Sequence, residues 1–155
     1  MIIYNKTFSM KTHKYIWVAL VLLVLTGCKN DYGKIIEAKK QILYAGVKNA
    51  PNHIRYTVRF ELYKPVSLDE VSVKSQNNSV LLEHLTIKDL KNGVAHSDLE
   101  AIPPGQYLLT STIAIPDLAK ADRQETLVFK IKLEGQSKLY TLTAPVILDK
   151  PVYMP

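Results

Sequence analysis

Cysteine is almost absent from this 155-residue chain, in which Cys28 is the only one. A single thiol excludes an internal disulfide, so an apolar core must hold the fold together. Glycine is scarce, with 6 residues, and there is neither a glycine-rich phosphate loop nor a Gly-x-Ser-x-Gly nucleophile motif. Only Met154 of the 3 methionines follows Cys28, which excludes a methionine-rich copper site. No dense block of lysine and arginine marks a nucleic-acid-binding surface. These absences argue against an enzyme and against binding to nucleic acid.

The apolar run at residues 15–25 is too short to be retained as a membrane-spanning helix. It has 11 residues, whereas a helix that crosses a bilayer needs about 20. Lys11 and Lys14 precede the run, and Leu25-Thr26-Gly27 leads from its end directly to Cys28. A basic start, a short apolar core and small residues before a cleavage point are typical of a secretory signal peptide.

The sequence Leu25-Thr26-Gly27-Cys28 resembles the lipobox of bacterial lipoproteins. The resemblance implies that residues 1–27 are removed as a lipoprotein signal peptide and that Cys28 becomes the lipid-bearing amino terminus. Several acyl chains on one cysteine give stable anchoring in a membrane. Because Lys29 rather than aspartate follows the cysteine, the resemblance favours the outer membrane, with the domain facing the periplasm. Cell-surface display, as in the Bacteroidota, is the alternative, and Asp31 alone represents the acidic cluster expected for it.

The mature chain has the length of one ordinary domain. Without residues 1–27, 128 residues remain and the net charge falls from +6 to +3, because Lys6, Lys11 and Lys14 are lost. Residues 28–40 are largely polar, and we expect them to form the lipidated amino terminus and a short tether. The folded domain is then expected over residues 41–155.

Alternation of apolar and polar residues predicts β-strands throughout this domain. The strongest pattern is Ile54–Leu62, in which every second residue is apolar. Related patterns follow at residues 71–73, 107–115, 127–133 and 139–148. Pro145 in the last of them predicts an edge strand or a bulge. Turn signals separate the patterns, and we therefore expect an all-β fold, an immunoglobulin-like antiparallel β-sandwich of about seven strands. A small antiparallel β-barrel is the alternative.

Tyr107 stands two residues after Gly105, at the start of an expected strand. Immunoglobulin-like sandwiches often place a tyrosine at such a corner, with its hydroxyl hydrogen-bonded to upstream backbone. Two interpretations are open. Tyr107 is either such a corner or an ordinary core tyrosine whose hydroxyl reaches the surface.

The polar side of the Ile54–Leu62 pattern is the main candidate for binding. Arg55, Arg59 and Tyr63 recur there at a spacing of four, so a strand would place them on one face. Arginine and tyrosine are frequent in the hot spots of protein interfaces. The alternative is a solvated face with cross-strand ion pairs.

Neither the histidines nor the acidic residues form a recognisable catalytic or metal-binding motif. No second histidine lies near His53 at a spacing typical of metal ligands. His84, His96 and Asp98 could form a metal site only if the fold brings them together. We therefore expect no bound metal. Asp69 and Glu70 are the only two acidic residues that are adjacent in the sequence. We expect it in a solvated turn before a strand, with the two side chains on opposite faces, which does not suit a glycosidase.

These observations predict a non-enzymatic envelope lipoprotein without a cofactor. Its partners would be the membrane, through the lipid on Cys28, and a protein of the envelope that it binds in a membrane-associated assembly. The second hypothesis is a ligand-binding lipoprotein that captures a metal, a glycan or a peptide.

Overall fold

The computed structural model describes residues 30–47, 50–76, 78–96, 99–115 and 123–155. All regular structure within these ranges is β-structure, as predicted. These same ranges contain no helix of the length and apolarity that crossing a membrane requires. Residues Asp31–Pro155 form one compact unit.

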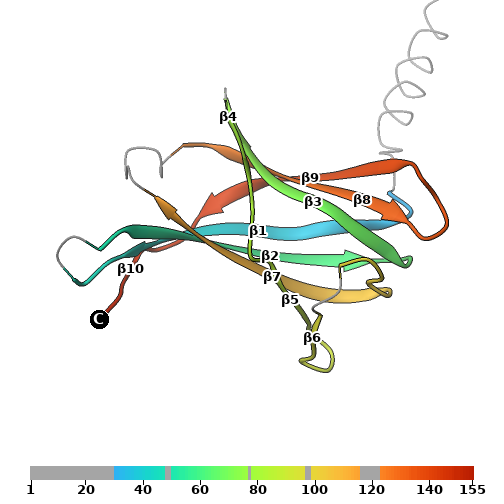
Figure 1. Cartoon of the computed structure of the whole chain (residues 1–155), viewed down its shortest axis with the longest axis horizontal. Coiled ribbons are helices and arrows are strands. Elements are labelled where there is room, and N and C mark those ends of the chain that lie inside the picture. Colours follow the sequence, from blue (N-terminus) through green and yellow to red (C-terminus); the bar gives the residue numbers. More distant parts are fainter. Residues whose placement is uncertain (1–29, 48–49, 77, 97–98, 116–122) are drawn as a thin grey trace, which may run out of the picture. The chain divides into compact units, whose positions relative to one another are not determined.

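The strands of this unit form a single curled, open sheet (Figure 1). The sheet order is β4-β3-β8-β9-β1-β2-β7-β5-β6, and β10 pairs with β1 outside this path. The strands are β1 (Gly33–Tyr44), β2 (Asn52–Leu62), β3 (Val66–Ser75), β4 (Asn78–Leu81), β5 (Thr86–Asp89), β6 (Ala95–His96), β7 (Gly105–Ile115), β8 (Glu125–Leu133), β9 (Leu139–Leu148) and β10 (Val152–Tyr153). Ten strands exceed the expected seven, and four of them, β4, β5, β6 and β10, are only two to four residues long.

The curl of the sheet brings its two halves face to face across one apolar core. The Phe60 ring on β2 lies edge-on to Phe129 on β8, with centroids 5.2 Å apart. Among the described residues, the two halves are joined as neighbouring strands at two pairs, Lys39 with Ile147 and Lys40 with Leu148. Figure 1 shows β3, β8 and β9 on one side of this core and β1, β2 and β7 on the other.

The expectation of purely antiparallel pairing is wrong at β1. Its pairings with β9 and with β10 are both parallel, whereas the other strand pairs are antiparallel. β9 pairs with β8 as far as Val146 and reaches β1 only at Ile147. Pro145 therefore lies where β9 has a ladder on one side only, which is the edge position predicted for it.

β2 has the alternating burial that its sequence predicts. The side chains of Ile54, Tyr56, Val58, Phe60 and Leu62 are buried, and this strand pairs along its whole length with β1 on one side and β7 on the other. The central position of β2 places its polar side in the middle of a broad surface.

The strands begin before residue 41, which is the start of the folded domain that the sequence predicts. β1 begins at Gly33, and Ala38 and Lys40 on its inner side are buried. A register shift between Ile35 and Glu37 interrupts the alternation of this strand. The bulge, together with a lysine at an inward position, hides the strand pattern from the sequence.

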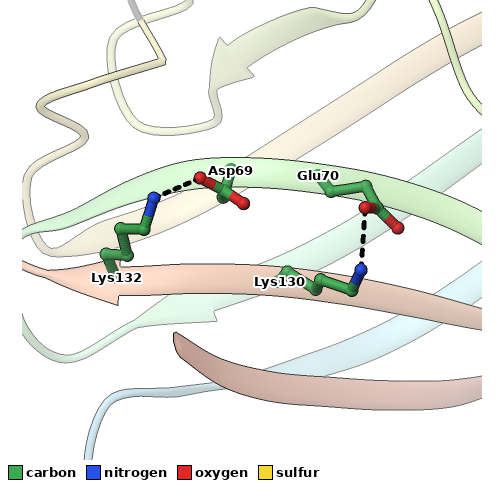
Figure 2. Close-up of polar contacts among 4 residues, drawn as sticks. All are labelled: Asp69, Glu70, Lys130 and Lys132. Atoms are coloured by element: carbon green, nitrogen blue, oxygen red, sulfur yellow. Dashed lines mark hydrogen bonds and ion pairs between the residues drawn. The ribbon is translucent and has the colours of Figure 1, made fainter. Parts of the chain in front are cut away.

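The adjacent acids Asp69 and Glu70 also differ from expectation. They lie within β3, not in a turn, and a register shift between Leu68 and Glu70 places both on the outer face. Lys130 Nζ lies 2.8 Å from Glu70 Oε2, and Lys132 pairs with Asp69 (Figure 2). The prediction of opposite faces is wrong because a bulge adds one residue and so reverses the alternation.

Tyr107 at the start of β7 is completely buried, and its hydroxyl donates a hydrogen bond to the Pro103 carbonyl at 2.8 Å. Of the two interpretations, the structure supports the tyrosine that bonds to upstream backbone. The ring stacks on Phe60 with centroids 5.4 Å apart. Burial raises the pKa of the Tyr107 hydroxyl, so it stays a donor.

Candidate interaction face

The outer side of β2 lies at the centre of the surface that we call the arginine face, the exposed side of β1, β2, β7 and β5. Arg55 and Arg59 are both exposed there. In the strand register, Arg55 lies between Gln41 and Thr112, and Arg59 lies between Glu37 and Leu108. The structure thus brings the two arginines together on one face, as the alternation predicts.

The arginine face has an excess of positive charge. Five basic and two acidic side chains lie on it, namely Lys34, Lys39, Arg55, Arg59, Lys88, Glu37 and Glu61. Both acids are paired with lysines, because Lys39 Nζ lies 2.8 Å from Glu37 and Lys34 Nζ lies 3.0 Å from Glu61. Within the described ranges, neither the Arg55 nor the Arg59 guanidinium forms an ion pair or a hydrogen bond. The predicted cross-strand pairing therefore occurs between Lys34 on β1 and Glu61 on β2, while Lys39 and Glu37 pair within β1, and both arginines are left free for a partner.

The ion pairs shift the pKa values of this face in the expected directions. A hydrogen bond with Lys34 lowers the pKa of Glu61. The hydrogen bond with Glu37 raises the pKa of Lys39, while the positive charge of Arg59 opposes this shift. Both acids are therefore occupied by their lysines.

Tyr63 lies at one end of the arginine face, directly after β2. Its side chain is 43% exposed, and Lys34 Nζ lies 5.8 Å from the centre of its ring. At about 3.3 Å per residue, Arg55 and Tyr63 are separated by roughly 26 Å along the strand. One small ligand does not reach across that distance, whereas the surface of a protein does.

Sequence reasoning missed a buried polar cluster on the inner side of the sheet. Lys40 is only 2% exposed, and its Nζ lies 3.3 Å from Glu125 Oε2 and donates to the Arg123 carbonyl at 2.7 Å. The Tyr56 hydroxyl donates to the same Glu125 oxygen at 3.1 Å. Burial, reinforced by the negative charge of Glu125, strongly raises the pKa of Tyr56. The one available signal was that Lys40 shares its alternation with Ala38 and Ile42.

A polar hollow of about 960 Å³ lies beside this cluster, across the ends of β3, β8 and β9. Residues 74–76, 123–126 and 145–146 line it. Glu125 is occupied by Lys40 and Tyr56, so the side chains of Lys74 and Arg123 are the charges that face a ligand there. The hollow therefore suits a small anion.

The remaining sequence candidates are not assembled into a site. His84 is exposed and has a φ of 52°, while the His96 ring packs edge-on against Tyr107 at 5.5 Å. No group of three or more potential metal ligands occurs among the residues that the structure describes. Asp98 and Cys28 lie outside those residues.

Comparisons of the chain with protein-family models, with curated proteins and with solved structures found no match. The functional argument therefore depends on the chain's own residues.

Proposed function

We propose that this chain is a non-enzymatic envelope lipoprotein that binds a protein partner through its arginine face. Cys28 carries the lipid, and the domain faces the periplasm from the outer membrane. The observation that carries the proposal is the pair of exposed, unpaired guanidiniums of Arg55 and Arg59 on a strand-built surface. Such a surface suits a partner with acidic side chains, because arginine binds carboxylates in a bidentate manner.

The strand order supports an immunoglobulin-like sandwich as the scaffold. The order β1-β2-β7-β5 corresponds to strands A-B-E-D of that fold, and β4-β3-β8-β9 corresponds to C′-C-F-G. Two packed layers would hold the arginines on a rigid surface, which lowers the cost of ordering them on binding.

Crosslinking in intact cells tests the arginine face. The double variant Arg55→Glu/Arg59→Glu should lose the crosslinked partner, because carboxylates would then face carboxylates. The control Lys91→Glu/Lys150→Glu changes the charge by the same amount on exposed loop residues and should retain it. Equal crosslinking of both variants, or no crosslinked partner for the unmodified chain, would refute the proposal.

The hollow supports the second candidate, a ligand-binding lipoprotein. A ligand that binds only the folded state raises the melting temperature. If the hollow captures a small anion, then inorganic phosphate or citrate should raise the melting temperature of the unmodified protein. The variant Lys74→Ala/Arg123→Ala should show no such rise. A melting temperature that no anion changes would leave the arginine face as the functional surface.

A further inference from the structure

Three tyrosines meet at the end of the domain where β1 begins. The Tyr32 ring lies 4.8 Å from the ring of Tyr140 on β9. Tyr63, directly after β2, donates its backbone N–H to the Tyr32 carbonyl at 3.0 Å. Residues before β1, after β2 and on β9 therefore gather at one place, although they are distant in the sequence.

Lysines surround these rings. Lys138 Nζ lies 5.2 Å from the centre of the Tyr140 ring, and Lys34 Nζ lies 5.8 Å from that of Tyr63. Lys64 and Lys138 are exposed and form no ion pair within the described residues. We call this group the tyrosine–lysine end; it consists of Tyr32, Tyr63, Tyr140, Lys34, Lys64 and Lys138.

The length of the tether holds this end close to the lipid anchor. Gly33 lies only five positions after Cys28 in the sequence, and a fully extended chain spans at most about 3.6 Å per residue, or about 18 Å here. If Cys28 is acylated, Gly33 stays within that distance of the acylated cysteine, which gives the neighbouring tyrosine–lysine end a high effective concentration at the headgroups.

We propose that the tyrosine–lysine end rests in the headgroup layer of the bilayer that holds the Cys28 lipid. This inference rests on the proposed lipid anchor. Tyrosine rings favour the interface because one side is apolar and the hydroxyl is polar. Lysines favour the same layer because their ammonium groups attract anionic lipid phosphates. The exposed acids Asp31 and Glu134 at this end oppose the lysines, and the Tyr32 and Tyr140 rings are partly buried against the core, so the exposed ring of Tyr63 contributes most of the contact.

This docking gives the domain one orientation. Arg55 lies roughly 26 Å along β2 from Tyr63, so contact at the tyrosine–lysine end leaves the part of the arginine face around Arg55 away from the lipid. The far end of the sheet carries exposed apolar residues as well, among them Ile147 and Tyr153. The experiment must therefore distinguish the two ends.

Tryptophan fluorescence makes this distinction. Trp17 is the only tryptophan and lies in the segment proposed to be removed, so one new tryptophan reports its own position. Acylated mature protein with Tyr63→Trp is placed in phosphatidylglycerol vesicles, with or without brominated acyl chains. We expect bromine to quench its emission about twofold, as for a side chain at the interface. The matched control Tyr153→Trp replaces a tyrosine that is 77% exposed at the far end, and its emission should not change.

Labelling of lysines in the unmodified lipoprotein needs no substitution and so does not depend on how the variants fold. A water-soluble acylating reagent should modify Lys64 and Lys138 several-fold more slowly in vesicles than in detergent. Lys91 and Lys150 should react equally in both. Three results with acylated protein would overturn this inference alone. They are an unquenched Tyr63→Trp emission, unprotected Lys64 and Lys138, and a quenched Tyr153→Trp emission. A mass that shows an unacylated Cys28 would overturn both this inference and the proposed anchor.

Discussion

Lys40 places a positive charge inside the core, where an unpaired ammonium is strongly disfavoured. The Glu125 carboxylate and the Arg123 carbonyl compensate that charge, and the Tyr56 hydroxyl gives Glu125 a further hydrogen bond. Each of these groups depends on the others, because the loss of one leaves another buried without its partner.

The first prediction concerns this pair. Lys40→Met should lower the free energy of unfolding by about 3–5 kcal/mol, because Glu125 is left without its counter-charge. Urea unfolding measures the loss. The double variant Lys40→Met/Glu125→Gln should lose less, since its amide oxygen still accepts from Tyr56 and no isolated charge remains. Equal losses of unfolding free energy in the single and double variants would show that the Lys40–Glu125 ion pair does not stabilise the fold.

The second prediction concerns alkaline pH. The pKa of Tyr56 is raised in the folded protein, so the unfolded chain loses this proton first, from about pH 10. The contribution of Tyr56 to stability is therefore complete below pH 10 and is lost as the pH rises towards the folded pKa. Tyr56→Phe should flatten the fall in melting temperature above pH 10, whereas Tyr153→Phe at an exposed position should not. An unchanged slope for Tyr56→Phe would contradict the assignment.

At the scale of the element, β1 is held by close backbone contact with β2. Gly33 pairs with Leu62, and a Cβ atom on Gly33 would lie 2.6 Å from the Glu61 carbonyl oxygen. Real Cβ atoms do not approach backbone so closely, so a side chain there forces the two strands apart.

The third prediction follows from that contact. Gly33→Ala should destabilise the domain by roughly 1–3 kcal/mol, because overpacking against backbone cannot be relieved by a rotamer change. Chemical denaturation measures the loss, and Lys34→Ala, at the exposed neighbouring position, serves as the control. If Gly33→Ala has no greater effect than Lys34→Ala, β1 and β2 are not in such close contact.

At the scale of the whole molecule, the proposed anchor lies outside the folded domain. The compact unit begins at Asp31, after Cys28. The fourth prediction is that a cleavable non-lipoprotein signal in place of residues 1–27, together with Cys28→Ser, moves the protein from the membrane fraction to the soluble periplasmic fraction. Its melting temperature should equal that of the acylated form in detergent. Continued membrane association would point to an attachment other than the lipid.

The alternation of apolar and polar residues along single strands accounts for the parts of the structure that the sequence predicts. In β2, no bulge interrupts the alternation, so the buried side and the exposed Arg55 and Arg59 follow from the sequence. In β1, the bulge after Ile35 and the inward Lys40 interrupt the alternation, so the sequence predicts a polar tether over part of this strand. At Asp69 and Glu70, one extra residue reversed the expected face.

The sequence by itself determined the all-β class and the polar side of the central strand, because both depend on neighbouring residues and on the two-residue period of a strand. Only the tertiary structure decided the parallel pairing of β1 with β9, the Lys40–Glu125 cluster and the meeting of Tyr32 with Tyr140. The physical reason is the distance along the chain between the residues that meet. The hydrogen bond from Lys40 to Arg123 spans 83 residues and that from Tyr56 to Glu125 spans 69, and such contacts arise from the register of distant strands.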